Sequence, residues 1–190
     1  TPASRRKFFI RNETVERLYT PEDLRLQAYF ADFFRMKEEP ESVTQGAAYV
    51  RMWREVEYYS GGIYDGTPRT LLANDILIRL PDILLLRAEM KAATGDREGA
   101  VADLDVVRRR AGVAGYSEAE GDLRRAIQLE RDRELLFQTG VRYFDYMRNH
   151  TYNLLKGGFR DLTETDVAAG ALFLPVSLDA MNNNPKVKQT

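Results

Sequence analysis

The sequence of 190 residues is long enough for one domain or a domain and a half, and its 44% hydrophobic and 30% charged residues are typical of a globular protein. The formal net charge is −1 and charges of both signs are interspersed, which argues against an extended nucleic-acid-binding face. Cysteine is absent and His150 is the only histidine, so a disulfide framework, a cysteine nucleophile and any site with paired histidine ligands are excluded.

Residues 1–75 predict short strands and long loops. Residues 24–30 and 48–59 alternate apolar and polar side chains, which is the pattern of half-buried strands. Residues 33–45 are charged and interrupted by Pro40, which indicates a hairpin loop or flap, and residues 60–68 are rich in turn formers. We therefore expect an irregular strand-and-loop subdomain over residues 1–75.

Residues 76–112 predict two antiparallel helices. Pro81 suits the first turn of a helix, and Gly95 and Asp96 suit the end of that helix and the cap of the next. Helical spacing then predicts the two packing faces, which consist of Leu80, Ile83, Leu84, Ala88 and Lys91 or Ala92 in the first helix and Ala100, Leu104, Val107 and Ala111 in the second. The length is about that of one tetratricopeptide unit, which has 34 residues.

A third helical segment follows Ser117, its expected cap, and continues to Gly140. One face of this segment carries Leu123, Ala126, Ile127, Glu130, Glu134 and Phe137. A short helix is expected over residues 141–148, and an extended stretch over residues 172–176. The predicted fold is mainly α, with tetratricopeptide-like helix pairs in a helical region over residues 76–190 and the strand-and-loop subdomain before it.

Few patterns in the sequence suggest catalysis. His150 lies beside Asn149, Thr151 and Tyr152, where a solvated loop histidine is a better interpretation than a member of a Ser-His-Asp triad. The pair Gly61-Gly62 lacks the Lys-Ser/Thr that would follow in a phosphate-binding loop. We expect no catalytic residue, no cofactor and no metal.

The densest charge cluster is the helical segment around Glu130 and Glu134. These two carboxylates share a helix face, and such a pair could serve glycoside hydrolysis. Neighbouring arginines favour their ionised forms, whereas a general acid must keep its proton. We therefore predict a structural charge network that joins packed helices, made of Glu130, Arg131, Arg133, Glu134, Arg142 and Asp145, with Arg108 and Arg110 as possible partners.

Two other groups of residues could indicate binding sites. Arginines at 108–110 and 124–125 are diluted by acidic neighbours, so solvated helix faces are a better interpretation than a nucleic-acid site. Aromatic rings at 53–64 could stack on sugars, or could pack the strand region against the helices. The candidate ligand-binding residues are Trp53, Tyr58, Tyr59, Tyr64 and Arg69.

Four motifs in order resemble those of the SusD/RagB family. Residues 78–89 (IRLPDILLLRAE) are similar to R-x-A-[DE]-x-L-L-x-x-A-E, and residues 95–112 (GDREGAVADLDVVRRRAG) to G-D…A…L-N-x-V-R-x-R-A-G. Residues 127–135 (IQLERDREL) and 142–145 (RYFD) are similar to I-x-x-E-R-x-x-E-L…G-x-R-[WY]-[FW]-D. Residues 174–176 (LPV) and 184–189 (NPKVKQ) are similar to the closing P-I-P…N-P-x-[LI]-x-Q-N, and Asp23-Leu24-Arg25 matches a D-x-R more weakly.

The sequence departs from these motifs at a few positions. Pro81 and Met90 each stand where the family usually has alanine, and residues 138–141 replace its E-G-x. In the family these motifs are structural, so the departures affect no known chemical role. No ligand-binding residue can be carried over by motif.

The resemblance implies a Bacteroidetes surface lipoprotein. Such proteins lie on the outer face of the outer membrane, where they cap a SusC-type TonB-dependent transporter and bind glycans or, in some members, peptides without cleaving them. Family members are usually much longer, so this chain would be a C-terminal portion, with the lipid anchor outside it. We thus expect a non-enzymatic nutrient-binding protein without nucleic-acid contact. The alternatives are a helical-repeat adaptor for a protein partner and a glycoside hydrolase that uses Glu130 and Glu134.

Overall fold

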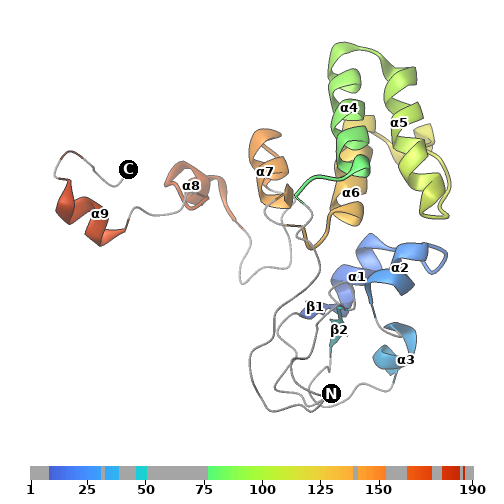
Figure 1. Ribbon diagram of the computed structural model, residues 1–190, viewed down its shortest axis with the longest axis horizontal. Coiled ribbons are helices and arrows are strands. Elements are labelled where there is room, and N and C mark those ends of the chain that lie inside the picture. The colour runs from blue at the N-terminus through green and yellow to red at the C-terminus, as the bar shows by residue number, and fades with distance from the viewer. Residues whose placement is uncertain are drawn as a thin grey trace, which may run out of the picture. The chain divides into compact units, whose positions relative to one another are not determined.

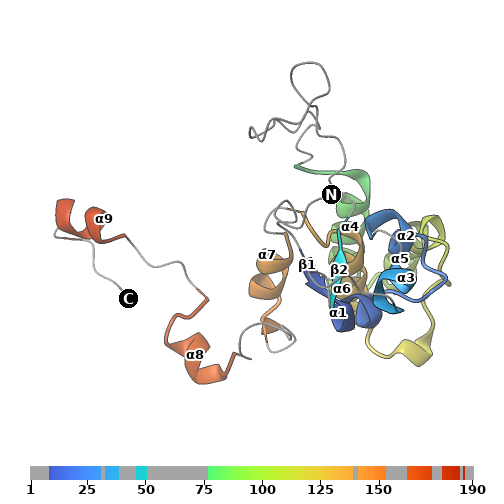
Figure 2. The same cartoon turned by 90° about the horizontal axis from the view of Figure 1, so that it is seen from below.

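The structure, a computed structural model, describes residues 9–30, 33–38, 46–50, 77–138, 141–152, 162–172, 177–184 and 186. Contacts divide the chain into two compact units, Thr1–Arg142 and Tyr143–Thr190. The described residues are mainly helical (Figures 1 and 2), which confirms the predicted fold class. Whether the helix pair is a tetratricopeptide repeat stays a prediction, as do the domain boundaries.

The first described part combines three short helices with a small sheet. The helices are α1 (Asn12–Leu18), α2 (Leu24–Tyr29) and α3 (Phe33–Glu38). Strands β1 (Phe9–Arg11) and β2 (Ala47–Tyr49) pair antiparallel, with Ile10 opposite Ala48. The buried side chains of this part form one apolar cluster with Leu136, which comprises Val15, Leu18, Tyr19, Leu26, Phe30, Phe33 and Ala48.

The strand predicted over residues 24–30 is wrong, because most of this segment forms α2. The Asp23 carboxylate accepts a hydrogen bond from the backbone N–H of Arg25 at 2.9 Å and so caps the helix. The alternation of apolar and polar residues in this segment also predicted the wrong buried positions. Leu24 is 61% exposed, whereas Arg25, the polar residue next to it, is 4% exposed. Part of the predicted flap is likewise helical, since α3 occupies Phe33–Glu38.

The predicted antiparallel helix pair is confirmed as α4 (Leu80–Thr94) and α5 (Arg97–Arg110). Gly95 ends α4 in the left-handed conformation with φ 91°, which glycine adopts without steric cost. The Asp96 carboxylate caps α5 by accepting the backbone N–H of Gly99 at 2.9 Å. Figure 1 shows α4 and α5 side by side, and α6 (Leu123–Glu134) contacts α4 as well.

The three helices α4, α5 and α6 share a second apolar core. It contains Leu85, Ala88, Ala100, Leu104, Val107, Leu123, Ala126 and Ile127. Every residue of the predicted face of α5 is buried, whereas the prediction of the buried face of α4 was only partly correct. Leu80 and Ile83 are 69% and 48% exposed, whereas Leu85, which was not chosen, is fully buried. Apolar residues surround α4 on more than one side, so periodicity alone could not select its buried face.

Local caps begin the later helical segments. Ser117 forms a capping box with Glu120 at the short 3₁₀-helix η2 (Glu118–Glu120), and Asp122 caps α6. Helix α7 (Val141–Arg148) has the predicted bounds. Two further helices, α8 (Glu164–Ala168) and α9 (Leu178–Asn183), were not predicted. Within the described ranges, no helix is long and apolar enough to cross a membrane.

Candidate functional site

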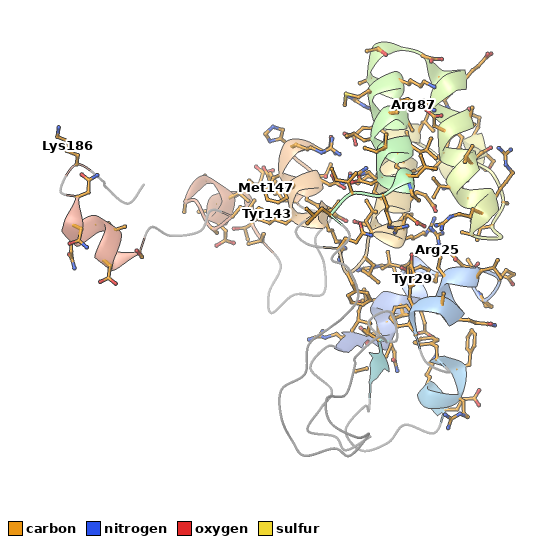
Figure 3. All side chains as sticks on the ribbon, viewed as in Figure 1. Arg25, Tyr29, Arg87, Tyr143, Met147 and Lys186 are labelled. Carbon is orange, nitrogen blue, oxygen red and sulfur yellow. The ribbon has the colours of Figure 1, made fainter. Side chains whose placement is uncertain are left out.

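The predicted pair Glu130 and Glu134 lies at the centre of a buried arginine–carboxylate cluster. Both side chains are fully buried on one face of α6. The guanidinium group of Arg25 reaches them from α2, with Nη1 2.7 Å from Glu130 Oε1 and 3.1 Å from Glu134 Oε2. Figure 3 shows Arg25 between α2 and the adjacent ends of α5 and α6. This one arginine therefore connects the first apolar core with the helices of the second.

Arg25 is held in place by a third carboxylate. Its Nη2 donates to Asp23 Oδ2 at 2.8 Å, and its Nε donates to Asp23 Oδ1 at 2.9 Å. Burial by itself would lower the pKa of Arg25, but the hydrogen bonds of Asp23 and the charges of Glu130 and Asp23 raise that pKa above its ordinary value. Such a forked, charge-assisted pair fixes the orientation of the guanidinium group.

Further arginines occupy the remaining carboxylate oxygens. Arg108 Nε and Arg133 Nη1 donate to Glu130 Oε2 at 3.3 and 3.2 Å. Arg79 and Arg110 both donate to Glu134 Oε1. Each carboxylate thus has three arginine partners among the described residues, and Arg25 is common to both.

A second layer of pairs extends the cluster. Arg108 donates from Nη1 and Nη2 to Glu120 at 2.8 and 2.9 Å, and this hydrogen bonding lowers the pKa of the Glu120 carboxyl below its ordinary value. Arg131 lies 2.8 Å from Asp82 Oδ1 of α4 and also donates to the backbone carbonyl of Asp82. The cluster therefore ties α6 to both helices of the preceding pair.

Of the six residues predicted for the charge network, Glu130, Glu134 and Arg133 lie at the centre of the cluster. Arg131 belongs to its second layer. Arg131 pairs with Asp82, and Arg142 pairs with Asp132. The sixth, Asp145, lies in the second unit, where Arg148 donates to it at 2.8 Å. Both suggested partners contact the central carboxylates: Arg108 pairs with Glu130, and Arg110 pairs with Glu134.

Sequence reasoning missed Arg25, Asp23 and Arg79 as members of the cluster. Each of them lies in a motif of the sequence, because Asp23 and Arg25 form the D-x-R motif and Arg79 is the second residue of the segment IRLPDILLLRAE. Sequence spacing could not connect them to Glu130, which lies 105 residues after Arg25.

A pocket of about 430 Å³ lies beside the cluster. Its walls are the segment between α1 and α2, the turn after α5, and side chains of the cluster. The lining residues are Leu18, Thr20, Glu22, Asp23, Arg108, Gly112, Val113, Ala114, Gly115, Glu120 and Arg133. The charged groups Asp23, Arg108, Glu120 and Arg133 are already paired with each other or with neighbours, and Glu22 is a further charged residue of the wall.

This geometry argues against the glycosidase alternative at Glu130 and Glu134. Both carboxylates are fully buried, and arginine N–H groups occupy their oxygens, so a glycosidic oxygen has no access to either one. The cluster is arranged to hold helices together. Within the described part of the chain, no group of three or more histidine, aspartate or glutamate side chains is placed to bind a metal ion.

The candidate ligand-binding residues Trp53, Tyr58, Tyr59, Tyr64 and Arg69 lie outside the described residues. Their role stays a prediction.

Comparison with known proteins identifies the family. A sequence model of the SusD family matches residues 4–190. A SusD homologue from Bacteroides thetaiotaomicron VPI-5482 has a similar structure, with 26% identity and a TM-score of 0.75 over 94% of this chain and 37% of that chain. No curated protein matches the sequence.

Two more distant structures have the same fold. A SusD superfamily protein from the same strain is 22% identical with a TM-score of 0.64, covering 95% of this chain and 38% of that one. Another from Bacteroides fragilis NCTC 9343 is 20% identical with a TM-score of 0.58, covering 94% and 39%. The chain thus spans less than two fifths of the length of these structures. Because the family match extends over nearly every residue, the chain belongs to the SusD family.

Proposed function

We propose that this chain is part of a non-catalytic protein that binds a nutrient at the outer surface of a Bacteroidetes cell. The family match over residues 4–190 carries the proposal. The buried cluster supports it, since the most enzyme-like carboxylates, Glu130 and Glu134, are engaged by arginines. On this proposal, binding rests on shape, ring stacking and hydrogen bonds, and not on an activated acid or base.

The proposed ligand is a glycan or a peptide, and the proposed contact residues are Trp53, Tyr58, Tyr59, Tyr64 and Arg69. Aromatic faces suit sugar stacking, whereas an arginine can pair with a peptide carboxylate. Isothermal titration calorimetry with a panel of oligosaccharides and of short peptides distinguishes the two ligand classes. Saturable binding within one class supports the proposal, and no binding to either class by the complete gene product contradicts it.

Ring substitutions test the contact residues separately from the function. Trp53→Ala and Tyr64→Ala should each weaken binding about tenfold, which corresponds to about 1.4 kcal/mol. Phe34→Ala is the matched control, because it removes a ring that is 49% exposed in α3 and is not among the proposed contact residues. Unchanged affinity in both Trp53→Ala and Tyr64→Ala would remove these contacts from the proposal.

The proposed partner is a SusC-type TonB-dependent transporter, to which the bound nutrient is delivered. The proposed location is the outward face of the outer membrane, through a lipid anchor. Purification of the tagged complete gene product from its own membranes should recover a TonB-dependent transporter. External protease should degrade the tagged protein on intact cells. Recovery of the protein alone from the soluble fraction contradicts both parts.

A further inference from the structure

The walls of the pocket beside the cluster are fixed by hydrogen bonds. Arg133 Nε donates to the carbonyl of Leu18 at 2.6 Å, and the backbone N–H of Leu24 donates to the carbonyl of Ala111 at 3.0 Å. These two bonds hold the segment between α1 and α2 against the ends of α6 and α5. All of the described lining residues lie in the first compact unit. The pocket is therefore largely pre-formed, as small-molecule sites usually are.

The turn after α5 forms another wall and has a defined shape. Asp105 of α5 accepts a hydrogen bond from the backbone N–H of Tyr116 at 2.8 Å. A Cβ at Gly115 would lie 2.6 Å from Asp105 Oδ2, so glycine lets the turn lie this close to α5. The backbone N–H groups of Ala114 and Gly115 have no hydrogen-bond partner among the residues that the structure describes. Both groups remain available to a ligand.

The charges of the lining are not fully balanced. It contains three carboxylates and two guanidinium groups, which gives a formal charge of −1. Asp23 is paired with Arg25, and Glu120 is paired with Arg108. Glu22 is exposed and has no ion pair or hydrogen bond within the described ranges. The uncompensated charge of the pocket is therefore the Glu22 carboxylate.

This lining is a poor site for an anion or a sugar. Arg108 and Arg133 both pair with Glu130, so their charges are already balanced, and an anion would also be repelled by Glu22. None of the described lining residues is aromatic, so the lining lacks the ring face on which sugars commonly stack.

The lining suits an ammonium compound that has an aliphatic side chain. Glu22 attracts the ammonium group, and Leu18, Val113 and Ala114 supply aliphatic surface. Arg133 uses Nε and Nη1 within the fold, whereas its Nη2 has no partner among the described residues. Nη2 can therefore donate to an oxygen of the ligand.

We propose that the pocket binds an α-ammonium group next to an aliphatic side chain, which a free amino acid and the amino end of a peptide have in common. The Glu22 carboxylate binds the ammonium group, and Arg133 Nη2 donates to a carbonyl or carboxylate oxygen of the same ligand. The pocket volume of about 430 Å³ lies within the range of about 300–1,000 Å³ that is typical of small-molecule sites. The inference does not rest on the proposed function, because it uses only residues of this pocket.

Calorimetry of the complete gene product with three probes tests the ligand chemistry. The probes are L-leucine, the tripeptide Leu-Gly-Gly, and N-acetyl-Leu-Gly-Gly, which lacks the charged amino group. Saturable binding is expected for the first two, and the tighter of them identifies the source of the ligand. Acetylation of the tripeptide should weaken its binding roughly tenfold or more, because a charge-assisted contact is lost.

A substitution at Glu22 tests the place of binding. Glu22→Gln should weaken binding of the tighter probe roughly tenfold or more. It should leave the circular dichroism spectrum unchanged, because Glu22 is exposed. Glu98→Gln is the matched control, because it removes an exposed carboxylate of α5 that is not among the lining residues, and it should leave binding unchanged.

Three results would each overturn the proposal. The first is the absence of binding to L-leucine and to Leu-Gly-Gly. The second is equal affinity for the free and the acetylated tripeptide, which would mean that the ammonium group is not recognised. The third is a Glu22→Gln protein that binds the tighter probe as well as the wild type does, which would place the binding outside this pocket.

Discussion

Arg25 and Glu130 are 105 residues apart in sequence, yet Arg25 Nη1 lies 2.7 Å from Glu130 Oε1 in a site where their side chains are 5% and 0% exposed. The contact joins α2, at the start of the described chain, to α6. Breaking a buried pair leaves a charge without compensation, which costs more free energy than the intact pair contributes. Because Arg25 pairs with three buried carboxylates, its loss should lower the stability of the fold strongly.

Replacement of Arg25 should destabilise the protein strongly. Arg25→Met leaves Asp23 without its forked partner and removes one donor from each of Glu130 and Glu134, so the free energy of unfolding should fall by about 3–5 kcal/mol. Urea denaturation followed by circular dichroism measures the change. Arg124→Met is the matched control on the exposed side of α6 and should change stability by less than about 0.5 kcal/mol. Equal effects of the two substitutions would mean that the cluster does not stabilise the fold.

The core between α4, α5 and α6 should be sensitive to loss of volume. Leu104 is fully buried in α5, and Leu104→Ala should lower the free energy of unfolding by about 2–5 kcal/mol through lost burial and the cavity left behind. Val106→Ala, two residues away and 45% exposed, should change it by about 0.5 kcal/mol or less. Thermal denaturation of both variants checks the difference, and a larger effect at position 106 would contradict the assignment of the buried face.

Two glycines separate backbone strain from side-chain crowding. Gly112, after α5, has φ 74°, and a Cβ there would lie 3.0 Å from Leu24 Cγ. Gly95 has φ 91° with no atom within 4 Å of such a Cβ. Alanine at either position should cost about 1–2 kcal/mol for the left-handed conformation.

At position 112 the contact with Leu24 should add to that cost. Gly112→Ala should therefore lower the free energy of unfolding more than Gly95→Ala does. This difference should disappear when Gly112→Ala is made in a protein that already carries Leu24→Ala. Urea denaturation of Gly95→Ala, Gly112→Ala, Leu24→Ala and the double variant measures the difference, and a difference that persists without the Leu24 side chain would show that another contact is responsible.

Alkaline pH should destabilise the protein through Tyr19. Burial raises the pKa of Tyr19 above its ordinary value of 10, and its hydroxyl donates to the backbone carbonyl of Arg133 at 2.6 Å. Above pH 10 the unfolded chain releases this proton and the folded protein keeps it, so folding becomes less favourable as pH rises, and this contribution is complete only below pH 10. The wild type should lose about 1.4 kcal/mol per pH unit more than Tyr19→Phe above pH 10. Parallel stability curves for the two proteins would contradict this.

The sequence predicted those elements whose signals are local. Gly95 and Asp96 define the turn between α4 and α5 by their own conformational and capping preferences, and both act as expected. Residues 24–30 show the limit of such reasoning, because a segment of seven residues is too short for the periodicity of its side chains to distinguish a strand from a helix. What decides α2 is the cap at Asp23 and the burial of Arg25 against Glu130, and the second of these depends on a distant helix.

The same limit applies to the site. Glu130 and Glu134 were identifiable as a structural pair from their arginine neighbours in sequence, but Arg25 and Arg79 enter the cluster only through tertiary packing. The exposure of Leu80 and Ile83 in α4 was also not predictable, because their helical spacing assigned them to the buried face.

The most direct test of the account combines binding and cleavage in one measurement. The complete gene product is incubated with each member of the oligosaccharide and peptide panel, binding is followed by calorimetry, and the recovered ligand is analysed by mass spectrometry. We expect saturable binding to one ligand class, with the ligand recovered unchanged and Glu130→Gln having no effect on its recovery. Shortened products that disappear in a folded Glu130→Gln variant would contradict the account and establish an enzyme.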